Sequence, residues 1–178
     1  MVQVASAAPL FEADALVGKE FKKIALADYL KKGSKKGKWV ILFFYPLDFT
    51  FVCPTEIRGF ADQYDDFKDR NCEVIGCSTD SKFSHKAWSE AKDGIGLLPF
   101  PLVADFNKVI ARDYGVLLEN AGFALRGTFI IDPDGILQYM VVHNTNVGRS
   151  TEETLRVLDA LQAGGMCPVN WKKGQKQL

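Results

Sequence analysis

The sequence predicts an α/β protein with a mixed central sheet and helices on both faces. Apolar runs suited to buried strands alternate with amphipathic helical segments, and a hairpin signal and a last helix follow them. Strand–helix–strand units give parallel neighbours, whereas a hairpin gives antiparallel ones. The chain has 178 residues, of which 47% are hydrophobic. This is the size of one domain, with enough apolar side chains to bury a substantial core.

Two predicted strands surround a helix in the first half of the chain. Residues 38–45 (KWVILFFY) form a continuous apolar run, which is typical of a strand buried on both faces. Residues 73–77 (EVIGC) give a second such strand. Between them, apolar residues recur at three- and four-residue spacing, which predicts an amphipathic helix. That apolar stripe consists of Ile57, Phe60, Tyr64 and Phe67.

The middle of the chain repeats this alternation with shorter elements. A helix is predicted over residues 81–92, with Ser81 as its cap. A short strand over residues 101–104 follows, and then a helix over residues 107–114. Gly115 is a natural stop for that second helix, because glycine readily adopts the left-handed conformation found after helix ends.

The last third contains a hairpin and a final helix. Strands are predicted over residues 127–131 and 136–143, on either side of the turn sequence Asp132-Pro133-Asp134-Gly135. A helix is predicted over residues 150–161, where Ser150 begins a capping box and a glycine pair ends the helix. This order of elements is compatible with a thioredoxin-like core that carries an N-terminal extension. We expect one domain over residues 1–163 and a C-terminal tail over residues 164–178.

Composition and charge argue against two classes of partner. Lys and Arg together number 22, as do Asp and Glu, so the net charge is zero and lacks the basic excess of nucleic-acid binders. No segment approaches the roughly 20 apolar residues that a membrane span needs. A secretory signal has a basic region followed by an apolar core, and the N-terminus of this sequence shows no such pattern. We therefore expect a cytoplasmic protein with neither nucleic acid nor membrane as a partner.

The cysteines are candidates for redox chemistry, because a chain with a substantial hydrophobic core does not need disulfide bonds for stability. None of the cysteines forms a CxxC pair, and only two histidines accompany them, so we expect no structural zinc site. Cys72 and Cys77 belong to a predicted buried strand and are expected to be packing residues. The four cysteines are Cys53, Cys72, Cys77 and Cys167.

Cys53 lies where the first buried strand gives way to a helix, the edge at which α/β sheets usually bind ligands. Pro54 suits the first helical position, which places Cys53 at or beside the cap. Unpaired N–H groups and the helix dipole favour negative charge there, and hence the nucleophilic thiolate. Pro46 is expected to shield this sulfur, and the Thr50 hydroxyl to bond to the sulfur or to an incoming oxygen.

A fixed cation would complete such a site. Arg126 and Arg149 are the candidates, since each lies beside a glycine at the edge of a predicted element. Arginine keeps its charge and presents several donors in fixed geometry. Cys167 lies in the predicted tail, where a mobile thiol could reach another sulfur. Trp171 is expected to anchor the tail by burying its ring.

The segment FFYPLDFTFVCPTE closely resembles the active-site segment of the typical 2-Cys peroxiredoxins, which include the peroxide-reducing component of bacterial alkyl hydroperoxide reductase. The family motif Pro-x-x-x-Thr-x-x-Cys is matched by Pro46, Thr50 and Cys53. Further segments resemble the family in family order, so the resemblance covers nearly the whole chain. They are VIGCSTDSKFSHKAW, LRGTFIIDPDG, VGRS and MCPVNW.

The resemblance implies a role for each of nine residues. Cys53 would be the peroxidatic cysteine and Cys167 the resolving cysteine of the other subunit in a homodimer. Thr50 and Arg126 would position and polarise the peroxide, and Pro46 would shield the pocket. The supporting residues would be Glu56 and Arg149, which hold Arg126, together with Tyr45, which lines the pocket, and Trp88, which packs near it.

The implied activity is a peroxidase that needs no metal, haem or flavin. Cys53 would attack hydrogen peroxide or an alkyl hydroperoxide and become a sulfenic acid. A disulfide between Cys53 and Cys167 would follow, and thioredoxin or a flavoprotein reductase would reduce it. The resemblance further implies a pentamer of dimers and a role in cell redox homeostasis, to which a holdase role could be added.

The sequence departs from over-oxidation-prone family members at two places. Their Gly-Gly-Leu-Gly loop is only partly matched by Asp93-Gly94-Ile95-Gly96, and their C-terminal Tyr-Phe pair is absent from the given chain. The departures predict easy local unfolding and resistance to sulfinic acid formation.

Two other functions compete with the peroxidase. A thioredoxin-like disulfide reductase needs a second cysteine three positions after Cys53, where Glu56 stands. A holdase chaperone or scaffold would not need Pro46, Thr50, Cys53 and Arg126 together.

Overall fold

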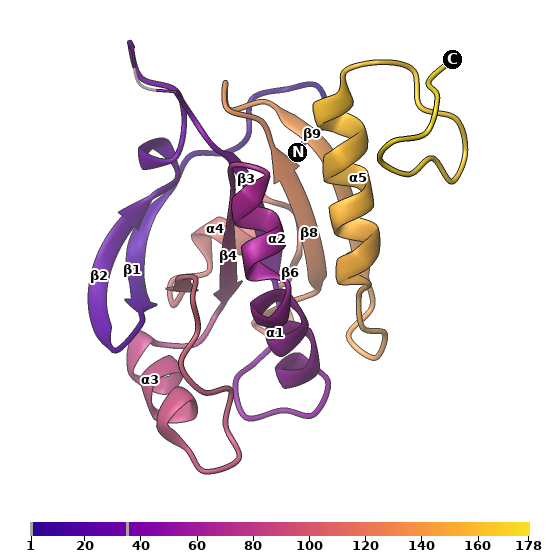
Figure 1. Ribbon diagram of the computed structural model, residues 1–178. Coiled ribbons are helices and arrows are strands. Elements are labelled where there is room, and N and C mark those ends of the chain that lie inside the picture. The colour runs from indigo at the N-terminus through magenta and orange to yellow at the C-terminus, as the bar shows by residue number, and fades with distance from the viewer. Residues whose placement is uncertain (1, 35) are drawn as a thin grey trace.

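The computed structural model describes residues 2–34 and 36–178 of the chain. Its regular elements alternate along the chain as the α/β prediction requires (Figure 1). The strands are β1 (Glu12–Val17), β2 (Glu20–Ala25), β3 (Trp39–Phe44), β4 (Cys72–Ser78), β5 (Leu102–Ala104), β6 (Leu117–Leu118), β7 (Phe123–Ala124), β8 (Arg126–Ile131) and β9 (Leu137–His143). The helices are α1 (Cys53–Asp62), α2 (Tyr64–Asp69), α3 (Lys82–Glu90), α4 (Val109–Asp113) and α5 (Thr151–Ala163), with a 3-10 turn at Leu26–Asp28.

A seven-stranded sheet in the order β2-β1-β5-β4-β3-β8-β9 forms the centre of the molecule. β4 is parallel to both of its neighbours, β3 and β5. β8 runs antiparallel to both β3 and β9, and β1 runs antiparallel to both β2 and β5. The predicted mixed sheet is therefore confirmed, including the hairpin of β8 and β9.

Helices cover both faces of the sheet, as predicted. Side chains of β3 alternate between two cores: Ile41 and Phe43 face α1, α2, α3 and α5, whereas Leu42 and Phe44 face α4. Figure 1 shows α1, α2 and α5 on one side of the sheet. Because β3 and β4 are buried on both faces, their sequences are continuously apolar rather than alternating.

The N-terminal extension contains a hairpin that the sequence did not reveal. β1 and β2 pair antiparallel and extend the sheet at one edge, with Gly18 at positive φ in the turn. Residues 20–23 of β2 are all exposed. An edge strand exposed in this way has no apolar run by which a buried strand would be recognised.

The helices also differ from the prediction in two details. The stripe after Cys53 is divided into α1 and α2 at Gln63, whose backbone leaves the helical region. At α5, Ser150 Oγ accepts from Glu153 N as expected, but the Glu153 carboxylate pairs with Arg156 rather than completing the capping box. Ser81 caps α3 as predicted, by accepting from Ser84 N.

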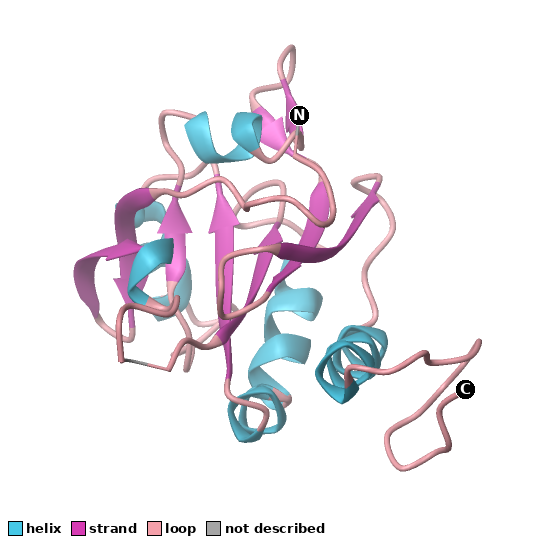
Figure 2. Cartoon of the chain, turned by 90° about the horizontal axis from the view of Figure 1, so that it is seen from above, coloured by secondary structure: helices cyan, strands magenta, loops and turns pink. Residues whose placement is uncertain are grey.

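No helix within residues 2–34 and 36–178 is both long enough and apolar enough to cross a membrane. Beyond α5 the chain forms a tail that loops away from the body of the molecule (Figure 2). Within this tail Trp171 is buried, as the sequence predicts.

Candidate active site

Cys53 is the first residue of α1, and its side chain is completely buried. β3 ends at Phe44, so the loop over residues 45–52 carries the chain from the sheet to this helix. The sequence placed Pro54 at the first helical position, whereas it occupies the second and Val52 is the cap. No side chain caps this helix start. The first-turn N–H groups and the helix dipole therefore favour negative charge on the Cys53 sulfur.

Arg126 supplies the cation nearest to this sulfur. Its Nη1 lies 3.4 Å from Cys53 Sγ, and its side chain is only 3% exposed. Its Nε and Nη2 donate to Thr145 O at 2.8 and 2.6 Å. Arg126 begins β8, which neighbours β3 in the sheet, so one sheet edge holds both the arginine and the loop that leads to the cysteine. Of the two arginines that the sequence offered, Arg126 contacts the sulfur.

Glu56 joins the two arginines. Its carboxylate accepts from Arg126 Nη1, from Arg149 Nε at 2.8 Å and from Arg149 Nη2 at 3.0 Å. Arg149 is tied to β8 as well, since its Nη1 donates to Gly127 O at 2.7 Å. The bidentate, charge-assisted pair with Glu56 fixes the plane of the Arg149 guanidinium, and the bonds to Glu56 and Thr145 O together fix that of Arg126. Glu56 therefore holds Arg126 in place, and Arg149 holds Glu56.

The charged side chains beside Cys53 do not balance one another. Burial is the strongest influence on the pKa of Glu56 and raises it, but the hydrogen bonds and charge of Arg149 and the charge of Arg126 together hold the pKa below its ordinary value. Burial lowers the pKa of Arg149, and the contact with Glu56 opposes that effect. Two guanidinium groups and one carboxylate leave one positive charge in a buried site. A Cys53 thiolate would neutralise it, and a buried charge is costly unless it is paired.

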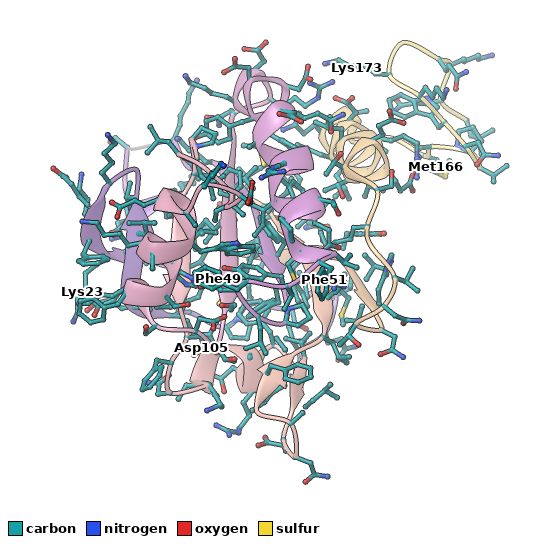
Figure 3. The ribbon with its side chains drawn as sticks, turned by 90° about the horizontal axis from the view of Figure 1, so that it is seen from below. Lys23, Phe49, Phe51, Asp105, Met166 and Lys173 are labelled. Carbon is teal, nitrogen blue, oxygen red and sulfur yellow. The ribbon has the colours of Figure 1, made fainter. Side chains whose placement is uncertain are left out.

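A pocket of about 260 Å³ includes Cys53 among its lining residues, and most of the side chains around it are apolar. The Thr50 hydroxyl donates to Leu47 O at 2.9 Å, which leaves the lone pairs of its oxygen available as acceptors. Phe51 also lines the pocket and is 94% exposed. Figure 3 shows where its side chain lies. The lining residues are Pro46, Leu47, Thr50, Phe51, Val52, Cys53, Phe123, Arg126 and Thr145.

Tyr45 does not line this pocket, contrary to the prediction. Side chains alternate along the strand that precedes it, so Tyr45 lies in the same core cluster as Phe43. Its hydroxyl donates to Asp48 Oδ1 at 2.9 Å. The Trp88 ring packs 6.2 Å from the Tyr45 ring and 5.8 Å from that of Phe49. The Trp88 ring thus packs against two side chains of the loop over residues 45–52, which leads to Cys53.

A buried polar network that was not predicted lies under the same loop. The Asp48 carboxylate accepts from Ser84 Oγ at 2.7 Å and lies 2.8 Å from His85 Nδ1. The Asp48 backbone N–H donates to Asp80 Oδ2 at 2.9 Å. Burial and the charge of Asp48 raise the pKa of Asp80. These contacts join loop 45–52 to α3, and no periodic or spacing pattern signals such a network.

The other cysteines differ from Cys53 in their surroundings. Cys72 and Cys77 are buried in β4, and burial raises the pKa of both thiols. This agrees with their expected role in packing. Cys167 is half-buried in the tail, and all four cysteines are free. Within the part of the chain that the structure describes, no group of three or more His, Cys, Asp or Glu side chains is arranged so that it could hold a metal ion.

Comparison with known proteins finds relatives that match this chain over nearly its full length. Residues 4–140 match the AhpC/TSA family. A thioredoxin peroxidase of Fasciola hepatica is 51% identical over all of this chain and 92% of its own length. The reduced 2-Cys peroxiredoxin of Plasmodium vivax is 42% identical, with a TM-score of 0.92 over 99% of this chain and 92% of its own.

AhpC of Enterococcus faecalis is 39% identical, with a TM-score of 0.87 over 94% of this chain and 100% of its own. These solved structures share the mixed sheet and the thioredoxin-like arrangement described above. Matches that extend over nearly full length, at both the sequence and the structural level, cannot rest on one short motif. The chain therefore belongs to the AhpC/TSA family and is a peroxiredoxin.

Proposed function

We propose that Cys53 is the peroxidatic residue of this thiol-dependent peroxidase. The observation that carries the proposal is the position of its buried sulfur, 3.4 Å from Arg126 Nη1, in a residue that lines a pocket. The buried cluster lacks one negative charge, and the thiolate supplies it. Peroxiredoxins as a family act on peroxides through such a thiolate, so the substrates are hydrogen peroxide and alkyl hydroperoxides.

The first step is attack of the Cys53 thiolate on one peroxide oxygen. A sulfur–oxygen bond forms as the oxygen–oxygen bond breaks, and hydroxide or alkoxide leaves and takes up a proton from water. Cys53 becomes a sulfenic acid. Arg126 donates to the oxygen on which charge develops, while the Thr50 oxygen accepts from the peroxide hydroxyl and orients it. Pro46 keeps water from the sulfur, and no metal or organic cofactor is required.

The second step joins Cys53 to Cys167 of another subunit. A completely buried sulfur cannot meet a second cysteine, so the first turn of α1 has to unwind. The absence of a side-chain cap at Val52 lowers the cost of that unwinding, because no capping bond is broken. β9 is the outermost strand at its end of the sheet, which gives a second copy of the chain an edge to pair with. A homodimer built in this way, and a pentamer of such dimers, would bring the two cysteines together.

Thioredoxin or a flavoprotein reductase would then reduce the disulfide by thiol–disulfide exchange. The relative from Fasciola hepatica carries the name thioredoxin peroxidase, which supports thioredoxin as donor. Glu56 stands where a thioredoxin-like reductase needs its second cysteine, and its carboxylate is already bound by both arginines.

A peroxide-consumption assay coupled to thioredoxin tests this proposal. Cys53→Ser should abolish turnover. Cys167→Ser should complete one turnover and then stall without a small thiol. Cys72→Ser is the matched control, because it changes a buried cysteine outside the site and should leave turnover intact. On non-reducing gels, peroxide should give a covalent dimer that Cys53→Ser and Cys167→Ser both lack; full activity in Cys53→Ser would disprove the proposal.

A further inference from the structure

The C-terminal tail closes on the cysteine to which we assign disulfide formation. Leu178 N donates to Met166 O at 2.9 Å, so the two ends of the tail meet. The side-chain amide of Gln177 donates from Nε2 to Cys167 Sγ at 3.6 Å. The Cys167 sulfur also lies 3.8 Å from Ala160 O of its own α5. Cys167 is thus turned inward, against the helix that precedes it.

Gly165 provides the space that the Gln177 amide occupies. A Cβ atom at position 165 would collide with Gln177 Oε1 and lie 2.7 Å from its Cδ. Gly165 is not among the glycines with positive φ, so its backbone suits any residue. The three atoms nearest to such a Cβ all belong to the flexible side-chain amide of Gln177. An alanine there would displace that amide and leave the backbone as it is.

A second set of contacts docks the tail at Trp171, apart from this closure. The Trp171 ring is 4% exposed, and its carbonyl accepts from Arg156 Nη1 at 3.1 Å. Lys173 lies 3.5 Å from Asp159 on the same helix. Figure 3 shows Met166 and Lys173 on the tail beyond α5. Docking at Trp171 and closure at Gln177 involve different residues, so a substitution can remove one and keep the other.

We propose that Gln177 is a positioning residue that latches Cys167 in the resting tail, and that this latch opens before the disulfide forms. The proposal rests on the assignment of Cys167 as the resolving cysteine. In that step the Cys167 thiol loses its proton and attacks the Cys53 sulfur of the sulfenic acid. The sulfur–oxygen bond breaks, and the departing hydroxide takes up a proton to become water. The contact between Gln177 and Cys167 exists only in the closed tail, so it stabilises the reactant and not the transition state.

Removal of the latch should accelerate disulfide formation alone. In rapid-mixing experiments with hydrogen peroxide, Gln177→Ala should raise the rate constant for disulfide formation about two- to tenfold, the effect of one weak hydrogen bond and its packing. The rate constant for Cys53 oxidation should not change. Gly165→Ala should have the same effect, because it displaces the same amide. Lys176→Ala is the control, since it changes the exposed residue next to Gln177 and should match the parent protein.

The double variant Gly165→Ala/Gln177→Ala separates a latch from a general loosening of the tail. Each substitution removes the same contact, the one between the Gln177 amide and Cys167. The double variant should therefore form the disulfide no faster than either single variant. Additive rate increases would overturn the latch, as would an unchanged or slower rate in Gln177→Ala. A Cys167→Ser protein that still forms the covalent dimer would overturn the assignment of the resolving cysteine, and the latch with it. Loss of that dimer, with an unchanged rate in Gln177→Ala, would overturn the latch alone.

Discussion

Cys53 and Cys167 are both free thiols, but the structure holds them in opposite ways. Cys53 is completely buried at the start of α1, beside a cluster of charged side chains drawn from α1, β8 and the segment before α5. Cys167 is half-buried in the tail, and its polar contacts lie at 3.6 to 3.8 Å. Strong bonds between distant parts of the chain fix one sulfur, and weak, mostly local contacts hold the other.

This difference fits the roles that we propose for the two thiols. Attack on a peroxide needs donors that are already aimed at the developing charge, because an oriented site needs no reorganisation during the reaction. Disulfide formation needs a sulfur that leaves its place, and weakly held segments open at low free-energy cost. The two halves of the cycle therefore demand a rigid site and a loose one in the same chain.

Arg126→Lys should have the largest effect of these changes on the rigid Cys53 site. The guanidinium donates to Thr145 O and to Glu56 at once, and we propose that it also donates to the developing oxyanion. Lysine keeps the charge, but its single nitrogen cannot reproduce this fixed fork of donors. The rate constant for Cys53 oxidation should fall about 10²- to 10³-fold, the usual cost of an oxyanion donor. Stopped-flow measurement with hydrogen peroxide would show this. Arg112→Lys, at an exposed ion pair with Glu119, is the control, and an equal loss there would refute the argument.

Glu56→Gln should be the most destabilising change to the charged cluster. It leaves Arg126 and Arg149 buried without their carboxylate, and breaking such a pair costs about 3–5 kcal/mol. Urea denaturation would measure the loss in unfolding free energy. Glu119→Gln removes a carboxylate from the exposed pair with Arg112, where solvent screens the charge, so it should cost far less. Equal losses in the two variants would show that burial of the cluster contributes nothing.

The same carboxylate should make stability depend on pH. The pKa of Glu56 is lower in the folded protein than in the unfolded chain, so the unfolded state binds its proton first as the pH falls. The stabilisation from Glu56 is therefore fully present above the unfolded pKa and is lost as the pH falls through the folded pKa. Denaturation measured across this acidic range should show a steeper loss in the parent protein than in Glu56→Gln. Identical pH profiles would contradict this.

Buried, continuous patterns made most of the fold predictable. β3, β4 and the hairpin of β8 and β9 were identified because their side chains are apolar or flank a strong turn sequence. β2 was missed because its outer residues are exposed and mostly charged, so its pairing with β1 leaves little trace in the pattern. The break between α1 and α2 at Gln63 interrupts a stripe whose spacing continues on both sides of it.

The candidate site was predictable for a different reason. Local spacing brought Pro46, Thr50 and Cys53 together, and the resemblance to peroxiredoxins singled out Arg126, which is 73 residues away from Cys53 in sequence. The prediction that Tyr45 lines the pocket was wrong because the motif does not indicate toward which side of the loop a neighbouring side chain points. The contacts of Asp48 with α3 were missed because they depend on how β3, β4 and α3 meet in space.

Resistance to over-oxidation tests how readily the rigid Cys53 site opens once its sulfur has been oxidised. The loop at residues 93–96 only partly matches that of sensitive family members, although Arg58 Nη2 donates to Gly94 O and ties the loop to α1. If α1 unwinds readily, the sulfenic acid reaches Cys167 before a second peroxide reaches it. Mass spectrometry after a modest excess of hydrogen peroxide should then show disulfide, with little Cys53 sulfinate. Complete conversion to the sulfinate would mean that the site opens slowly.

Trp171→Ala should have the smallest effect on global stability, although it removes the largest buried side chain of the tail. If the tail detaches while the rest of the domain stays folded, the docked ring adds no more to global stability than the free energy of that local opening. The loss in unfolding free energy should stay below about 1 kcal/mol, against about 3–5 kcal/mol for Phe60→Ala in the core. Phe60 is fully buried and stacks on Phe43 with ring centroids 4.4 Å apart. Hydrogen exchange in Trp171→Ala should show lost protection in the tail alone. A loss in unfolding free energy equal to that of Phe60→Ala would mean that the tail folds as part of the core.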